Sequence, residues 1–186
     1  MNEQSSPADA AWAFLIDFYG REGVSEACLV LQDEAGLDVV EMLMLIYADI
    51  ALGKSLSSDE IAALRAAMSS WREDVVLPLR ALRRTLKPPR EDIADNAKEQ
   101  LRAQIKKAEL TAERLQIDFA ANWLENATGG GPPPVATLSR LIAERSHNGM
   151  VEKALAHIIA VAQTGQDAPT RAAAAPRRRE HAVSGV

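Results

Sequence analysis

Apolar side chains recur along most of this chain at steps of three and four residues, the repeat of an α-helix with one buried face. In the first 90 residues this pattern predicts four helical segments, at residues 7–19, 25–35, 38–52 and 57–87. Pro7 suits the first turn of the first helix and Gly20 suits its end. The third segment is apolar almost all round, which predicts a helix in the middle of a bundle.

Polar residues mark where three of these helices start, because their side chains can accept hydrogen bonds from free backbone N–H groups. They are Ser25, Asp38 and Ser57. Asp38 and Ser57 are each followed three residues later by a glutamate, which predicts capping boxes. Pro78 lies inside the fourth segment, where proline removes a helical hydrogen bond and clashes with the previous turn. We therefore expect a kink or a break just before Pro78.

The second half of the chain predicts one long helix, from about residue 92 to residue 126. Its apolar residues form a heptad-like stripe of Leu101, Ile105, Ala108, Ala112, Leu115 and Phe119. The stripe is too short to choose between a coiled coil and a long arm of an antiparallel bundle. A Gly/Pro linker follows at residues 129–134, and helical periodicity returns over residues 137–163.

These segments predict an all-α fold, an irregular helical bundle of about five to six helices with a disordered C-terminal tail. The helical domain is expected to cover residues 1–163, and the basic tail, which has no apolar periodicity, residues 164–186. A chain of 186 residues can bury roughly two thirds of its unfolded surface. It therefore needs neither a disulfide nor a metal to hold its core.

Charge is distributed unevenly along the chain, although the net charge is only −5. Residues 1–50 hold ten acidic side chains and a single basic one, Arg21, whereas residues 80–90 hold five basic side chains and no acid. Such an asymmetry indicates either electrostatic pairing inside the fold or a binding face.

Four basic residues of the 72–87 segment share one face of a helix, because they lie at steps of three, four and seven positions. They are Arg80, Arg83, Arg84 and Lys87, and Leu79, Leu82 and Leu86 form a separate apolar stripe beside them. One interpretation is a solvated face that pairs with the acidic N-terminal half. The other is a site for an acidic protein, a nucleic acid or an anionic lipid.

Each candidate motif for catalysis, metal binding or nucleotide binding is better explained by an ordinary structural role. Glu144 and His147 have metal-ligand spacing, but a di-iron bundle needs a second such motif. Asp92 and Asp95 suit the start of a helix, where carboxylates are favoured by the helix dipole. Cys28 lies in an apolar helical run and is expected to be a buried thiol. We therefore expect no catalytic residue, no metal and no cofactor.

The chain carries neither a secretory signal nor a membrane span at the sequence level. Residues 1–9 lack a basic n-region, and the most apolar stretch, residues 39–52, is too short to cross a bilayer. We expect a cytoplasmic protein.

The order and spacing of several short words in the first 90 residues resemble a family of small uncharacterised bacterial proteins, a domain of unknown function. The resemblance covers roughly residues 11–90. The words are Ala11-Trp12-Ala13-Phe14, Tyr19, Gly23-Val24, Cys28 to Asp33, Gly36, Asp38-Val39, Trp71-Arg72, Pro78-Leu79-Arg80, Arg83-Arg84 and Leu86-Lys87. The resemblance implies a helical cytoplasmic protein and brings no activity and no catalytic residue.

Two hypotheses for the function remain open at this point. The favoured one is a non-enzymatic adaptor or regulatory protein that acts through protein partners. In one version of this hypothesis the partner is a second copy of the chain, bound through the long helix. The alternative is a small-molecule-binding protein or enzyme. Its polar pocket would lie between the helices at 25–35 and 38–52 and the 72–87 segment, lined by Gln32, Asp33, Asp38, Arg72 and Arg80. A buried cluster of these residues around a cavity would favour the alternative, and outward-pointing arginines would favour the adaptor.

Overall fold

The computed structural model of the chain describes residues 6–131 and 148–166, and all regular elements within these residues are helices. The all-α prediction is confirmed. The elements are α1 (Pro7–Tyr19), α2 (Val24–Ala35), α3 (Val39–Ile50), α4 (Ser58–Trp71), η1 (Arg72–Val76), α5 (Leu77–Thr85), α6 (Asp95–Glu125) and α8 (Gly149–Gln166). Part of the predicted linker, the segment 137–147 and the tail beyond residue 166 lie outside the described residues.

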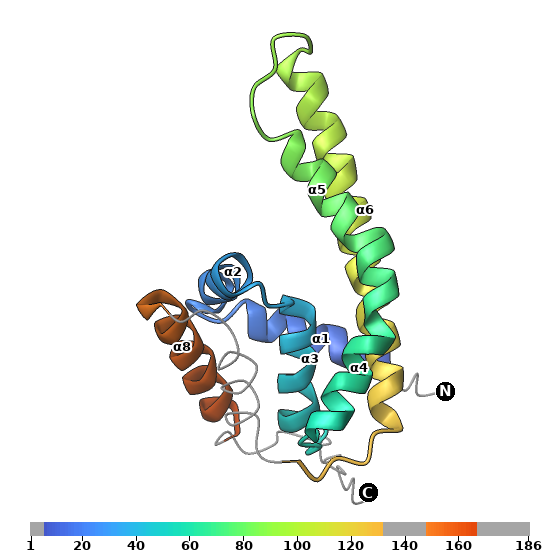
Figure 1. Cartoon of the computed structure of the whole chain (residues 1–186), viewed down its shortest axis with the longest axis vertical. Coiled ribbons are helices and arrows are strands. Elements are labelled where there is room, and N and C mark those ends of the chain that lie inside the picture. Colours follow the sequence, from blue (N-terminus) through green and yellow to red (C-terminus); the bar gives the residue numbers. More distant parts are fainter. Residues whose placement is uncertain (1–5, 132–147, 167–186) are drawn as a thin grey trace, which may run out of the picture.

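Helix α3 forms the centre of the core, as its all-round apolar pattern predicts. Met42, Met44 and Ile46 are almost completely buried. Helices α1, α2, α6 and α8 all contact α3, and α8 lies along α2 on one side of the body (Figure 1). The apolar faces of the surrounding helices therefore share a single core with α3.

The predicted helix ends agree with the structure at α1 and α4 and differ at α2. Helix α1 ends before Gly20, and the capping box of Ser57 with Glu60 is present. Helix α2 starts one residue after Gly23, whose φ of 73° is easily adopted only by glycine, so Gly23 rather than Ser25 is the N-cap. The side chain of Ser25 instead donates a hydrogen bond to Glu26.

Of the predicted kink or break before Pro78, the break is absent, but the helix is irregular there, with a π-helical turn at Arg72–Val76. Helices α4 and α5 are joined without interruption by the π-helical turn η1, in which the N–H of Leu77 donates to the carbonyl of Arg72, five residues back. Pro78 follows in the first turn of α5, where its missing N–H costs least. The wider π turn thus carries the helix past the proline.

Helices α5 and α6 form an antiparallel hairpin that projects from the body (Figure 1). We call η1, α5 and the part of α6 up to Leu115 the arm. Helix α6 has 31 residues, which gives it a length of about 46 Å. Its C-terminal part packs against α1, α3 and α4, whereas its N-terminal part has α5 as its neighbour. The apolar interior of the arm is thin and holds Val76, Leu86, Ile105 and Ala112.

The C-terminal end of α6 is fastened to the start of α4. Lys54 Nζ donates to the carbonyls of Leu124 and Glu125, each at 2.9 Å. One carboxylate oxygen of Glu60 accepts from the N–H and the hydroxyl of Thr128, at 3.0 and 2.9 Å, and from the N–H of Gly129 at 3.1 Å. These bonds fix the lower end of α6 and thereby the base of the arm.

Candidate functional site

A polar network joins the arm to the body, with Arg80 at its centre. The Arg80 guanidinium donates to Glu109 at 3.0 Å and to Glu113 at 2.5 Å on α6, and to Gln32 at 2.8 Å on α2. Three elements that are distant in sequence thus meet at one largely buried side chain. Because the guanidinium is planar and always charged, it can hold several such partners in fixed directions.

Glu109 carries a second arginine of this network. Arg83 donates to both carboxylate oxygens of Glu109. Burial by itself would raise the pKa of the Glu109 carboxyl, but hydrogen bonds from Arg83 and Arg80 outweigh burial and hold that pKa below its usual value. Burial raises the pKa of Glu113, although Arg80 acts against it. Glu113 is therefore the carboxylate of the two that takes up a proton first in acid.

The remaining residues of the predicted basic face are solvent-exposed. Arg84 pairs with Asp33 at 3.2 Å, and both side chains are 56% exposed, so the pair contributes little to stability. Lys87 is exposed too. The expectation of pairing with the acidic N-terminal half thus describes Arg84, whereas Arg80 and Arg83 find their carboxylates on α6.

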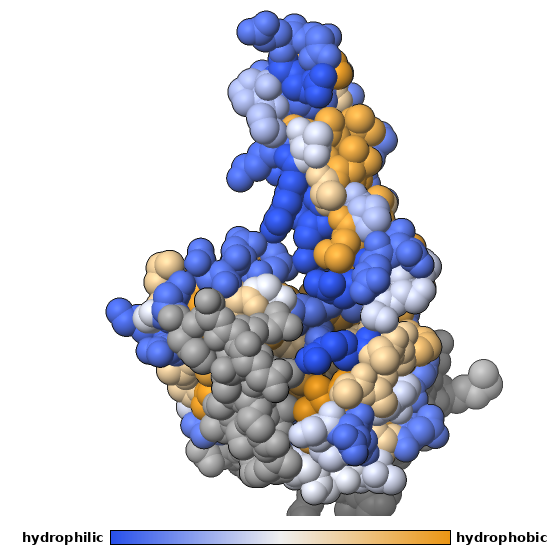
Figure 2. All heavy atoms as spheres, viewed as in Figure 1, coloured by the Kyte–Doolittle hydropathy of each residue, from blue (hydrophilic) through white to orange (hydrophobic). Residues whose placement is uncertain are grey.

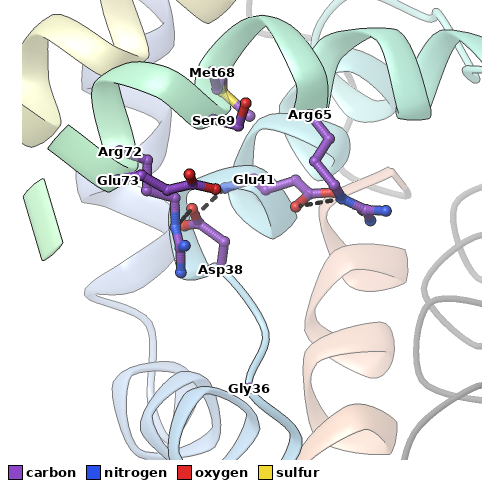
Figure 3. Close-up of a pocket in the computed structure, with 8 residues that line it drawn as sticks. All are labelled: Gly36, Asp38, Glu41, Arg65, Met68, Ser69, Arg72 and Glu73. Atoms are coloured by element: carbon purple, nitrogen blue, oxygen red, sulfur yellow. Dashed lines mark hydrogen bonds and ion pairs between the residues drawn. The ribbon is translucent and has the colours of Figure 1, made fainter.

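A separate pocket of about 180 Å³ lies between the start of α3, α4 and η1 (Figure 3). Asp38 and Arg72 form an ion pair on its wall. The other carboxylate oxygen of Asp38 caps α3 by accepting from the N–H of Val40 at 2.9 Å. Of the residues predicted to line a pocket, the structure places Asp38 and Arg72 together there. Gln32 and Arg80 belong to the arm network instead.

Two further carboxylates line this pocket. Glu41 is buried and binds the guanidinium of Arg65 through bonds of 3.0 and 2.7 Å, so it does not close the capping box predicted with Asp38. Glu73 extends from η1 toward Asp38 (Figure 3). Sequence reasoning missed Glu41, Arg65 and Glu73 as pocket residues, because nothing local indicates that α4 and η1 cross the start of α3.

Gln116 of α6 lies behind the pocket and is only 1% exposed. Its amide nitrogen donates to Asp38 at 3.5 Å and contacts the sulfur of Met68 at 3.9 Å. Its amide oxygen has no hydrogen-bond partner among the described residues. A buried acceptor without a partner is costly, so this polar atom next to the pocket is unusual. The only signal for Gln116 in the sequence is a polar residue on the buried side of α6.

The third feature is an apolar stripe along the outer side of α6. The heptad-like pattern divides in two, because Ile105 and Ala112 are buried while Leu101, Leu115 and Phe119 are 48%, 50% and 49% exposed. Figure 2 shows apolar side chains gathered on the side of the arm that faces away from α2. We call Leu101, Ala108, Leu115 and Phe119 the apolar stripe.

The apolar stripe lies in a charge-free sector of α6. With about 100° of rotation per residue, the positions that border the stripe are Gln104, Thr111 and Asn122. Every charged residue of α6 falls outside this sector. Next to the stripe, the indole N–H of Trp71 donates to the carbonyl of Ala112 at 3.0 Å, and its ring is partly exposed.

The model of a family described as "Protein of unknown function (DUF2390)" matches residues 10–119. The chain belongs to this family. The match extends beyond the predicted range 11–90 into α6, so it includes the arm network, the pocket and the apolar stripe. No curated protein and no solved structure matches the chain.

Other candidate chemistry of this DUF2390 member can be placed on the described residues. Within them, no three His, Cys, Asp or Glu side chains gather as metal ligands, and Glu144 and His147 lie outside them. Burial raises the pKa of the Cys28 thiol to about 12, which leaves almost no thiolate near neutral pH. None of the described helices combines the length and the apolar character needed to cross a membrane.

Proposed function

We propose that this protein is a non-enzymatic helical adaptor that binds a partner protein along the apolar stripe of its arm. The observation that carries the proposal is the exposed, charge-free stripe on a hairpin that projects from the body. Single exposed apolar residues are ordinary, but an aligned row of them is typical of an interaction surface. Charged residues are also depleted at the centre of protein interfaces.

The spacing of the stripe supports a helix as the bound element. Leu101, Ala108 and Leu115 are seven residues apart, which is the repeat that a second helix meets when it packs lengthwise. The small Ala108 leaves room for a large side chain of the partner. Trp71 and Phe119 lie at the lower end of this surface, and aromatic side chains are the usual anchors of interfaces. We therefore infer an amphipathic partner helix with an apolar face.

The arm network supports the same proposal because it holds the arm in a fixed direction. Arg80 bonds both α2 and α6, so tilting of the arm would break charge-assisted hydrogen bonds. A preorganised surface loses less conformational freedom on binding.

The charges favour a protein over a polyanion as the partner. Glu109 and Glu113 occupy Arg80 and Arg83, and the exposed Arg84 faces Asp33. A nucleic acid or an anionic lipid would have to compete with these carboxylates. A cytoplasmic location stays a prediction from the sequence.

A photo-crosslinking experiment tests this proposal in the native host. The full chain would carry p-benzoylphenylalanine in place of Ala108 on the stripe or, as a matched control, in place of Ala103, which is also exposed but lies on the charged side of the same helix. We expect one crosslinked partner from position 108 and none from 103, and we expect L101S/L115S to abolish the crosslink of position 108. Equal crosslinking from both positions, or none from either, would overturn the proposal, and a crosslink to a second copy of the chain would identify a homodimer.

A further inference from the structure

We propose that the pocket between α3, α4 and η1 binds a small zwitterion of amino-acid size. In this complex Arg72 holds the carboxylate of the ligand, and Glu73 together with Asp38 holds its ammonium group. The inference concerns a different surface from the apolar stripe and does not depend on the adaptor function.

The pocket presents unused charge of both signs. The Arg72 guanidinium pairs with Asp38 through its Nε, and no second residue in the part of the chain that the structure describes forms a hydrogen bond or ion pair with the Arg72 side chain. The carboxylate of Glu73 likewise has no partner there, and it points toward Asp38 in the close-up (Figure 3). A ligand that carries a carboxylate and an ammonium satisfies both, whereas an ion of either sign alone satisfies one.

The neighbouring pair explains why Arg72 and Glu73 are the free groups. Arg65 and Glu41 are matched to each other through a two-nitrogen contact, and this pair forms the far wall of the pocket (Figure 3). Three carboxylates and two guanidiniums therefore line the site, with Glu73 as the carboxylate in excess. This surplus favours a ligand with an ammonium group.

The π turn places both of these side chains in the pocket although they are adjacent in sequence. Successive residues of an α-helix point about 100° apart, and Arg72 and Glu73 are the first two residues of η1. A π turn rotates less per residue, so consecutive side chains come closer in direction. Turns of this kind occur frequently at functional sites in helices.

The size of the pocket limits the ligand. An apolar cavity of about 150 Å³ holds benzene, with six non-hydrogen atoms. The pocket of about 180 Å³ therefore takes a molecule of about six to nine such atoms. Free amino acids from alanine to aspartate lie in this range, and nucleotides do not.

An NMR titration of the ¹⁵N-labelled full chain tests the inference. The probes are L-valine, L-threonine and L-aspartate at millimolar concentration. Isovalerate and isobutylamine serve as matched controls, because they are valine without its amine and valine without its carboxylate. We expect at least one amino acid to shift the backbone signals of residues 69–73 and the side-chain amide of Gln116 saturably. We expect neither control to do so. Absence of such shifts with all three amino acids, or equal binding of either control, would overturn the inference.

Two charge-matched variants show whether the pocket is the site. Glu73→Gln removes the free carboxylate and should weaken binding at least about tenfold, the equivalent of one charged hydrogen bond. Asp74→Asn removes the same charge from the next residue of η1, which does not line the pocket, and should leave binding unchanged. Because both residues are exposed, both variants should fold. Equal affinities of the two variants would overturn the assignment to this pocket.

Discussion

Gly23 shows how one residue without a side chain positions two helices. Its φ of 73° lies in the left-handed region, and a Cβ built on it would come within 2.6 Å of the imidazole nitrogen Nε2 of His157 on α8. The same nitrogen lies 2.8 Å from the carbonyl oxygen of Glu22. The left-handed φ and the imidazole against it therefore both favour glycine at this position.

Gly23→Ala should lower the free energy of unfolding by more than the backbone strain alone, because the new methyl group displaces His157. Gly53→Ala is the matched control, with a φ of 62° and open space around its Cβ. We expect a loss of about 1–2 kcal/mol for the control and a further loss of about 1–3 kcal/mol for Gly23→Ala. Urea unfolding measures both, and equal losses would show that α8 adjusts without cost.

Glu60 gives stability a defined dependence on pH. Its pKa falls from 4.5 to about 2, chiefly through the hydrogen bond from the N–H of Ser57, with further bonds from Thr128 and Gly129. Because the pKa is lower in the folded state, the stabilisation is complete above about pH 4.5 and is lost as the pH falls toward 2.

Glu60→Gln should therefore cost about 1 kcal/mol at pH 7, the usual value of a helix cap. The difference from wild type should shrink as the pH falls from 4.5 toward 2. Thermal unfolding across this range measures it. Asp59→Asn, which removes an exposed charge from the same helical turn, should show a smaller effect. A Glu60→Gln deficit that stays constant with pH would contradict the assigned hydrogen bonds.

At the level of helices, Arg83 and Arg84 are adjacent residues of α5 with different surroundings. Arg83 is largely buried against Glu109, whereas Arg84 and Asp33 are more than half exposed. Arg83→Gln should lower stability by about 2 kcal/mol, since hydrogen bonds to a buried charge are lost. Arg84→Gln should cost under about 1 kcal/mol.

Chemical denaturation measures both losses, and repeating it in added salt distinguishes the two variants further. Exposed pairs are screened over about 10 Å at 0.1 M ionic strength, so the loss in Arg84→Gln should disappear in added salt. Most of the loss in Arg83→Gln should remain. Equal losses with equal salt dependence would show that the arm network is as exposed as the Arg84 pair.

The helices were largely predictable from the sequence, because the apolar residues of each helix recur at steps of three and four within that helix alone. The run from Pro7 to Tyr19 and the capping box at Ser57 needed only local information. The π turn could not be predicted from the sequence, because whether a proline breaks a helix depends on the helices packed around it. Of the residues that line the pocket, only Asp38 and Arg72 were singled out from the sequence, since Glu41, Arg65 and Glu73 reach it through packing between distant segments.

At the scale of the whole molecule, stability is distributed unevenly between the body and the arm. Helix α3 is enclosed by four helices, whereas the upper arm has a thin interior and ends in the exposed residues 87–97. Amides of α3 should exchange with solvent only through global unfolding, and those near the tip of the arm through local opening. Hydrogen-exchange mass spectrometry measures this order, and protection at the tip equal to that of α3 would contradict it.

The π turn also sets the directions in which the side chains of α5 point around the helix axis. Each residue of an α-helix advances the chain by about 100° around the axis, and a π turn by less, so every residue after η1 faces a different direction from the one that an unbroken α-helix would give it. Helices α4 and α5 both pack on α6. A graft of the arm onto another helical protein must therefore carry η1 with it, because a straight splice at Leu77 would turn Leu82 and Arg80 toward the wrong neighbours.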